Sequence, residues 1–258
     1  MDLTSILGFI IGTAMLLGGQ ALEGGNAGQL MQITAAMIVF GGTAGAVIVS
    51  FPASQLTDAF IYLKDVYGPL KVDIDAIIAE MIQYATKARR EGIIALEKDA
   101  RGASDSLLCL GLEAVADGVD PALVKEMLET QLGRLEDRVT NASKVWESAG
   151  AYSPTFGIIG AVMGLIQVMQ NLNDPSKLGA GIAVAFVATI YGLFAANLIT
   201  IPYSTRLKFK YAKVFMAKEM ILEGVMAIQA GESPALIERK LRAYILESNQ
   251  TQKTEKEG

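Results

Sequence analysis

The sequence predicts an all-α, polytopic membrane protein with four transmembrane helices and a helical cytoplasmic domain. Of its 258 residues, 52% are hydrophobic and only 19% are charged, and the mean hydropathy is +0.37. These values exceed those of an ordinary soluble domain. Four long runs contain no charged side chain, and no segment alternates apolar and polar residues as a half-buried strand would.

The first two uncharged runs, Leu3–Leu22 and Leu30–Phe51, predict a first transmembrane hairpin over residues 1–54. Each is as long as the roughly 20 residues that cross about 30 Å of hydrocarbon. No positive charge precedes the first run, so we interpret it as a retained helix rather than a signal peptide. Each run contains glycines four residues apart, a spacing typical of helix contacts: Gly8 and Gly12, and Gly41 and Gly45.

Residues 55–147 predict a helical cytoplasmic insertion. Its apolar residues recur on one helical face: Ile74, Ile77, Ile78, Met81, Ile82 and Ala85. Asp120 followed by Pro121 is a helix start signal, with a capping side chain and proline at the first helical position. Because no proline or turn signal follows before Gly150, we expect this helix to run directly into the third span.

Residues 148–205 predict a second transmembrane hairpin, formed by Gly150–Leu172 and Gly179–Tyr203. Pro154 lies near the start of the first of these runs, and Pro202 lies near the end of the second. Each proline has a simple interpretation, in which Pro154 only kinks a helix and Pro202 only ends a span. Small residues at helical spacing predict close helix packing: Gly157, Gly160, Gly164 and Gly192.

Residues 206–258 predict a cytoplasmic helical tail with a disordered end. The tail begins with basic residues and continues as a helix until Gly231, and Ser233-Pro234 starts another helix. Ser248–Gly258 is polar and charged without periodicity, which is typical of disorder.

The distribution of positive charge predicts the topology. Of the 22 Lys and Arg residues, 11 lie in the insertion, 10 in the tail and only Lys177 in a loop between spans. Cytoplasmic segments carry the excess of Lys and Arg in membrane proteins. Both termini and the insertion are therefore expected in the cytoplasm.

The most informative chemical feature is an absence, since no Asp, Glu, Lys, Arg or His lies in any of the four runs. The chain has no histidine at all, which argues against an enzyme and against a metal site. Its net charge of −5 gives no basic surface for nucleic acid. A protein that moves ions through its own body usually has an intramembrane ionisable group. If this chain forms part of an ion path, the titrating carboxylate must come from another chain.

The order of elements and three local motifs resemble the MotA/PomA family of flagellar stator subunits, in the MotA/TolQ/ExbB superfamily. The motifs are Ala88-Arg-Arg-Glu-Gly-Ile-Ile-Ala-Leu-Glu97, Tyr152-Ser-Pro-Thr-Phe-Gly-Ile-Ile-Gly-Ala-Val-Met-Gly-Leu165 and Ala183-Val-Ala-Phe-Val-Ala-Thr-Ile-Tyr-Gly-Leu193. The resemblance covers nearly the whole chain. It implies a pentameric ring in the lipid of the bacterial inner membrane, around a dimeric, one-span MotB or PomB partner whose membrane aspartate accepts the ion.

The resemblance also implies roles for individual residues. Pro154 and Pro202 match the prolines that couple ion binding to conformational change. Thr189 matches the hydroxyl that faces the partner's aspartate. The charged residues that engage the rotor protein FliG are matched in the first motif by Arg89 and Glu97, and Arg90 lies beside them. The simpler interpretations are that such a charge run is a solvated helix face and that the hydroxyl only pairs helices.

The same comparison bears on the transported ion. Sodium-driven relatives have a second threonine seven residues beyond the first proline, and this chain has Ala161 there. Dehydrating sodium requires several oxygen ligands, so the loss of a hydroxyl favours protons, although sodium remains an alternative. Asn197 occupies the position of a tyrosine in some relatives and is also expected to line the path. No cofactor is expected.

Two other functions remain open on the sequence. The first is an ion-driven energising subunit of another envelope machine, of the ExbB/TolQ kind. Those proteins typically have three spans with the large loop after the first, which the hairpin over residues 1–54 argues against. The second is a scaffolding membrane protein that conducts no ion.

Overall fold

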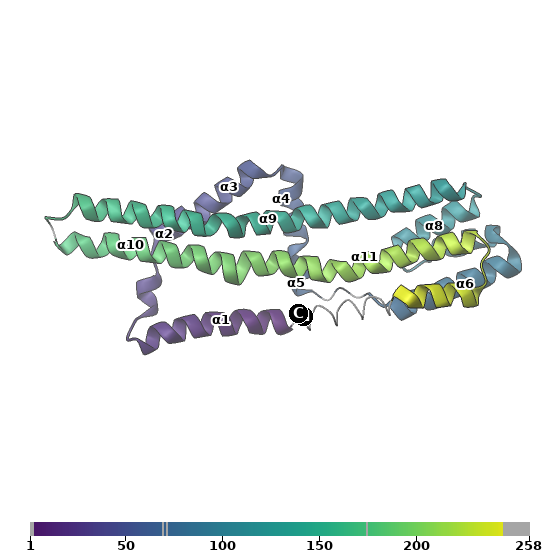
Figure 1. The fold of residues 1–258 in the computed structure, drawn as a ribbon, viewed down its shortest axis with the longest axis horizontal. Coiled ribbons are helices and arrows are strands. Elements are labelled where there is room, and N and C mark those ends of the chain that lie inside the picture. Colours follow the sequence, from purple (N-terminus) through teal and green to yellow (C-terminus); the bar gives the residue numbers. More distant parts are fainter. Residues whose placement is uncertain (1–2, 69, 71, 174, 245–258) are drawn as a thin grey trace. The chain divides into compact units, whose positions relative to one another are not determined.

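The computed structural model describes residues 3–68, 70, 72–173 and 175–244, and every regular element within these ranges is a helix (Figure 1). The chain forms two compact units. Unit 1 comprises Met1–Leu70 and Arg138–Lys210, and unit 2 comprises Lys71–Asp137 and Tyr211–Gly258. The predicted disordered end, Ser248–Gly258, lies outside the described residues.

Within the described ranges, four helices are long and apolar enough to cross a membrane: Leu3–Leu22, Ile33–Ser50, Pro121–Gln170 and Leu178–Gln229. The predicted fold class, an all-α membrane protein with four spans, is confirmed.

The second span begins three residues later than predicted, because a separate turn precedes it. The short helix η1 (Ala27–Leu30) is capped by Asn26, whose side chain accepts a hydrogen bond from the Gly28 N–H at 2.9 Å. The backbone is extended at Met31 and Gln32 before helix α2 (Ile33–Ala36) starts. The span continues as η2 (Met37–Gly41), which is a π-helix, and α3 (Gly42–Ser50).

The third span is part of one unbroken helix, α9 (Pro121–Gln170), of 50 residues. The Asp120 side chain caps its start, accepting a hydrogen bond from the Ala122 N–H at 2.9 Å. The predicted continuous helix from Asp120-Pro121 into the third span is therefore confirmed. Pro154 lies inside α9 without ending it.

The fourth span also continues past its proline. Helix α10 (Pro175–Phe194) leads into the π-helix η4 (Ala195–Thr200) and then into α11 (Ile201–Gln229), which includes Pro202. Proline has no N–H, and its ring crowds the carbonyl one turn earlier, so an ordinary α-turn there is costly. The wider π-turn lies directly before Pro202, and the Thr200 hydroxyl donates to the Ala195 carbonyl at 3.1 Å.

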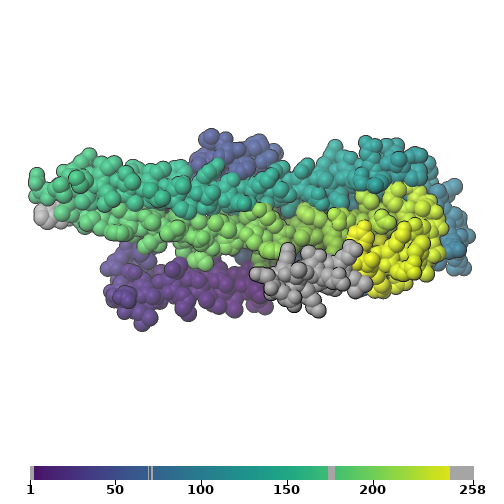
Figure 2. All heavy atoms as spheres, in the orientation of Figure 1, coloured from purple at the N-terminus to yellow at the C-terminus, as the bar shows by residue number. Residues whose placement is uncertain are grey.

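Helix α1 (Leu3–Leu22) contains no buried residue. It contacts the fourth-span helix at separate points: Arg206 donates to the Thr4 hydroxyl at 2.9 Å, and the Phe9 ring meets Phe194 edge to face at 6.3 Å. In the space-filling view, openings remain between these contacts, whereas α9 and α10 abut along their length (Figure 2). The closely packed part of unit 1 is therefore the α9–α10 pair.

Two short helices after the second span also belong to unit 1, namely α4 (Ala53–Ile61) and α5 (Leu63–Tyr67). Arg138 of α9 binds the Asp58 carboxylate through two hydrogen bonds of 2.6 and 3.0 Å. The ammonium group of Lys210 donates to three carbonyls at the end of α5: those of Asp65, Val66 and Gly68. Residues 55–68 thus pack against Arg138 of α9 and Lys210 of α11, which lie just outside the predicted spans.

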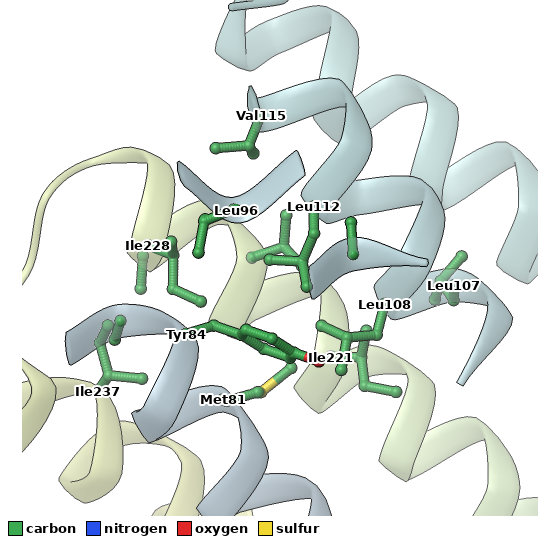
Figure 3. Close-up of a cluster of buried hydrophobic side chains, with 14 of the residues drawn as sticks. Met81, Tyr84, Leu96, Leu107, Leu108, Leu112, Val115, Ile221, Ile228 and Ile237 are labelled. Carbon is green, nitrogen blue, oxygen red and sulfur yellow. The ribbon is translucent and has the colours of Figure 1, made fainter. Parts of the chain in front are cut away.

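Unit 2 is built around a continuous apolar core (Figure 3). Its elements are α6 (Ile74–Glu91), η3 (Ile93–Leu96), α7 (Glu97–Ala100), α8 (Ser106–Ala116), the helix over residues 234–244 and parts of α9 and α11. Ile78, Met81 and Ala85 of the predicted apolar face of α6 are buried in this core. Large side chains with 0% exposure include Leu96, Leu108 and Leu112.

Candidate functional site

Glycines bring the backbones of α9 and α10 into direct contact. A Cβ atom at Gly192 would lie 2.5 Å from the Ser153 carbonyl oxygen and 3.0 Å from the Pro154 Cα. A Cβ at Gly157 would lie 2.9 Å from the Ala188 carbonyl oxygen, and one at Gly164 would lie 2.6 Å from the Gly181 carbonyl oxygen. Because the nearest atoms belong to the backbone, they cannot yield by a side-chain rotation. Only glycine fits this interface.

The other glycines singled out in the sequence differ in their surroundings. A Cβ at Gly160 would lie 2.6 Å from the Ala188 Cβ, and one at Gly12 would lie 2.7 Å from the Leu198 side chain. By contrast, Gly8, Gly41 and Gly45 have no such neighbour within 4 Å. Within this chain, the glycine pair of the second span therefore makes no close helix contact.

Both prolines lie beside this packed pair. The Ser153 side chain is 1% exposed, and its hydroxyl donates to the Gly192 carbonyl at 3.1 Å. Pro154 is consequently held against α10 by the residue before it. One turn earlier on α9, a Cβ at Gly150 would lie 2.6 Å from the Ile201 side chain, directly before Pro202. Pro202 itself is exposed.

The residues expected to line an ion path occupy different positions along the pair. Thr189 is half-buried, lies against Gly157 and donates its hydroxyl proton to the Ala185 carbonyl at 3.2 Å. Its oxygen can still accept a hydrogen bond. Ala161 is half-buried one turn beyond Gly157 on α9. Asn197 lies in η4, is exposed, and donates to the Leu193 carbonyl at 3.0 Å.

The residues expected to contact a rotor border the turn between α6 and α7. Arg89 and Arg90 are in the last turn of α6, and Glu97 begins α7. All three are exposed, and none forms an ion pair with any residue that the structure describes. The turn itself is fixed by the Lys87 ammonium, 2.6 Å from the Asp99 carboxylate, and this hydrogen bond raises the pKa of Lys87.

Tyr191 is a structurally important residue that the sequence reasoning missed. Its hydroxyl donates to the Leu30 carbonyl and accepts from the Gln32 N–H at 3.2 Å, and its ring stacks on Phe40 at 5.8 Å. It therefore anchors the break between η1 and α2. A phenol in a run of aliphatic residues is the available signal, since a buried hydroxyl requires a partner.

An aromatic cluster near Pro202 was also missed. The Tyr203 ring contacts Trp146 at 5.4 Å and Tyr67 at 5.5 Å, and the Tyr67 hydroxyl donates to that of Tyr203. The Trp146 indole N–H donates to the Ala59 carbonyl at 3.1 Å. The cluster joins α4, α5, α9 and α11, which are far apart in the sequence, so no local pattern identifies it.

Comparison with known proteins agrees with this architecture. Residues 99–220 match the MotA/TolQ/ExbB proton channel family, and residues 6–92 match the motility protein A N-terminal family. Motility protein A of Helicobacter pylori is 34% identical over 245 residues, which cover 95% of each chain. Chemotaxis protein PomA of Vibrio alginolyticus is 29% identical over 247 residues and 96% of each chain.

Solved structures are similar over the same length. The structure of C. jejuni MotAB aligns with a TM-score of 0.88 and 30% identity, over 95% of this chain and 96% of the other. The flagellar MotAB stator complex from Bacillus subtilis aligns with a TM-score of 0.85 and 31% identity, over 93% and 95%. The family consists of stator and ion-channel subunits rather than enzymes. The chain belongs to the motility protein A family of flagellar stator subunits, within the MotA/TolQ/ExbB proton channel family.

Proposed function

We propose that this subunit, together with a one-span MotB-like partner, couples proton flow across the bacterial inner membrane to torque on the flagellar rotor. The observation that carries the proposal is the pair of spans in α9 and α10, which has a packed backbone interface but contains no Asp, Glu, Lys, Arg or His. Such a pair cannot bind and release a proton by itself. The similar solved structures are MotAB complexes, which supports a partner that supplies the carboxylate.

The proposed assembly is a pentamer around a partner dimer, with both termini and residues 55–147 in the cytoplasm. The charge distribution supports this orientation, since Lys177 is the one Lys or Arg in a loop between spans. Large apolar side chains of α9 remain exposed in the single chain, among them Ile158 at 60% and Ile166 at 51%. Lipid, neighbouring copies and the partner helix would cover them.

In the proposed path, Thr189 faces the partner's carboxylate, with Ala161 and Asn197 along the same lining. The Thr189 hydroxyl already donates within its own helix, so it would act as an acceptor towards water or a protonated carboxyl group. Ala161 offers no oxygen ligand. A path of this kind favours protons, which move along water and carboxylates, over sodium, which needs several oxygen ligands.

The coupling step is proposed to occur at Pro154 and Pro202. One charge crossing 100 mV releases about 2.3 kcal/mol. This energy can shift a small-residue interface between two arrangements but cannot unfold a helix. Because α9 and α11 are continuous through their prolines, a change at either proline would be transmitted along the same helix. At the far end, Arg89, Arg90 and Glu97 would engage a FliG-like rotor protein.

Complementation tests the proposal. The chain would be co-expressed with its MotB-like partner in a stator-deficient cell, with a partner variant whose membrane aspartate is replaced by asparagine as the control. Swimming should return with the wild-type partner only, should persist without sodium and should stop on addition of a protonophore. Failure to swim in the presence of both assembled subunits would contradict the proposal, and dependence on sodium would contradict the assignment of the ion.

A further inference from the structure

One apolar side chain stands out on the surface of unit 2. Among the described residues of that unit, only two large apolar side chains are exposed: Ile94 at 73% and Leu123 at 49%. Unit 1 exposes many such residues, as expected for spans that contact lipid. A single exposed apolar side chain is ordinary on a protein surface, so any role for Ile94 depends on the turn that carries it and on the charges around it.

The exposure of Ile94 is built into the turn that carries it. Ile94 lies in η3, whose other large side chains point inward: Leu96 is 0% exposed and Ile93 packs against the core. Figure 3 shows Leu96 within that core cluster. Gly92 enters the turn with φ of +88°, a conformation that favours glycine. The Glu97 N–H donates to the Ile94 carbonyl and closes the turn.

The charges around Ile94 are exposed and form no ion pair in the described chain. Glu91 nevertheless lies close enough to Lys87 to add to the effect of Asp99 in raising the pKa of that amine. Arg89, Arg90 and Glu91 precede the turn, and Glu97 and Lys98 follow it; all five are exposed. None forms an ion pair with a described residue, whereas the neighbouring Lys87 and Asp99 pair with each other. An apolar centre within a rim of mixed charge is typical of a protein–protein contact.

We infer that Ile94 is the apolar anchor of the rotor contact, inserting into an apolar pocket of the rotor protein. Acidic groups at the edge of that pocket would face Arg89 and Arg90, and a basic group would face Glu97. The inference rests on the proposed function and deepens it. Rim charges of this kind mainly accelerate and orient the encounter. A desolvated side chain at the centre of a contact contributes more to how long it lasts.

Binding of the purified rotor protein to the assembled, detergent-solubilised stator complex tests this. Ile94→Ala should weaken binding roughly ten-fold or more through faster dissociation, Ile94→Asp should abolish it, and Ile94→Leu should stay within about three-fold of wild type. Leu123→Ala and Leu123→Asp are matched controls in the same unit and should bind as wild type. Higher salt should slow association of every variant while leaving the effect of Ile94→Ala in place.

The inference is overturned if the Ile94→Asp complex binds the rotor protein and swims as wild type, or if Leu123→Asp weakens rotor binding as much as Ile94→Asp does. It is also overturned if Ile94→Asp prevents assembly of the stator complex. It also falls if deleting residues 245–258 removes the effect of Ile94→Ala, because the chain's own tail would then be the occupant. Proton conduction by the variant complexes in vesicles should match wild type. Failure of the proposed function would look different, since the wild-type complex itself would then fail to restore swimming.

Discussion

The two units of this chain are stabilised in opposite ways. In unit 2 the fully buried side chains are large, such as Met81, Leu108 and Ile221. In unit 1 the most buried residues of the spans are small, such as Ala35 and Ala188, and glycines set the closest helix contact. In water, burying apolar area contributes about 25 cal/mol per Å². In lipid this term is absent between helices, and close backbone packing takes its place.

This difference fits the proposed roles of the two units, in which the spans of unit 1 respond to the ion and unit 2 contacts the rotor. An interface of small residues has flat surfaces and few interlocking side chains, so it can adopt a second arrangement at low cost. A core of interdigitated large side chains resists deformation and transmits strain. Unit 1 is therefore suited to respond to an ion, and unit 2 is suited to transmit force without changing shape.

The comparison predicts that truncating a large buried side chain lowers stability more in unit 2 than in unit 1. Leu112→Ala removes a side chain with 0% exposure from the core, and we expect a loss of about 2–5 kcal/mol in the free energy of unfolding. Hydrogen exchange of the α8 amides in the purified complex measures it. Leu123→Ala, on the surface of the same unit, is the control. Equal protection of α8 in both variants would show that unit 2 does not depend on its large side chains.

In unit 1, by contrast, we expect the largest loss of stability when a side chain is added at a glycine of the helix interface. Gly192→Val places a side chain against the Ser153 carbonyl and the Pro154 Cα, both backbone atoms. We expect a cost of about 3 kcal/mol, because α9 and α10 must separate, with a lower melting temperature and loss of swimming. Gly45→Val in the second span is the control, since no atom lies within 4 Å of the added Cβ. A Gly192→Val complex that melts and swims as wild type would contradict close packing at this position.

A smaller effect is expected where a single hydrogen bond joins the two helices. Ser153→Ala removes the buried bond to the Gly192 carbonyl, which should cost about 1 kcal/mol. If the bond also holds Pro154 in place, torque at high load should fall while assembly remains intact. Thr57→Ala is the comparison, because that exposed hydroxyl bonds only within α4. Torque equal to wild type would limit Ser153 to a packing role.

The smallest predicted effect concerns the ion pair between the exposed Arg138 and the half-buried Asp58. The hydrogen bond from Arg138 holds the pKa of Asp58 below its usual value. A lowered pKa stabilises the folded protein fully above the unfolded pKa, near pH 4, and this contribution is lost as the pH falls through the folded pKa. Asp58→Asn should therefore cost about 0.5 kcal/mol at pH 7 and progressively less in acid. Melting temperatures measured across this range would contradict the ion pair if the difference stayed constant.

The sequence was sufficient for features that depend on local composition. Charge-free runs predicted the four spans, the Asp120-Pro121 signal predicted the start of α9, and the periodicity of α6 predicted its buried face. It was insufficient where partners lie far apart in the chain. Tyr191 binds residues 159 and 161 positions away, and Asp58 binds a residue 80 positions away. The ion-path, coupling and rotor roles stay predictions, because they depend on partner chains.

The π-helix before Pro202 also sets which way that proline faces. Buried residues occur at Ala185, Ala188 and Gly192 of α10 and at Ala195 of η4, in alternating steps of three and four, and Ala196 of η4 is buried beside Ala195. An uninterrupted continuation would bury positions 199, 202 and 206, but the buried residues are Thr200, Ser204 and Leu207. The extra residue in the wide turn thus shifts the helical phase by one position, about 100° of rotation. Pro202 is thereby turned away from the contact with α9 and is exposed in the single chain.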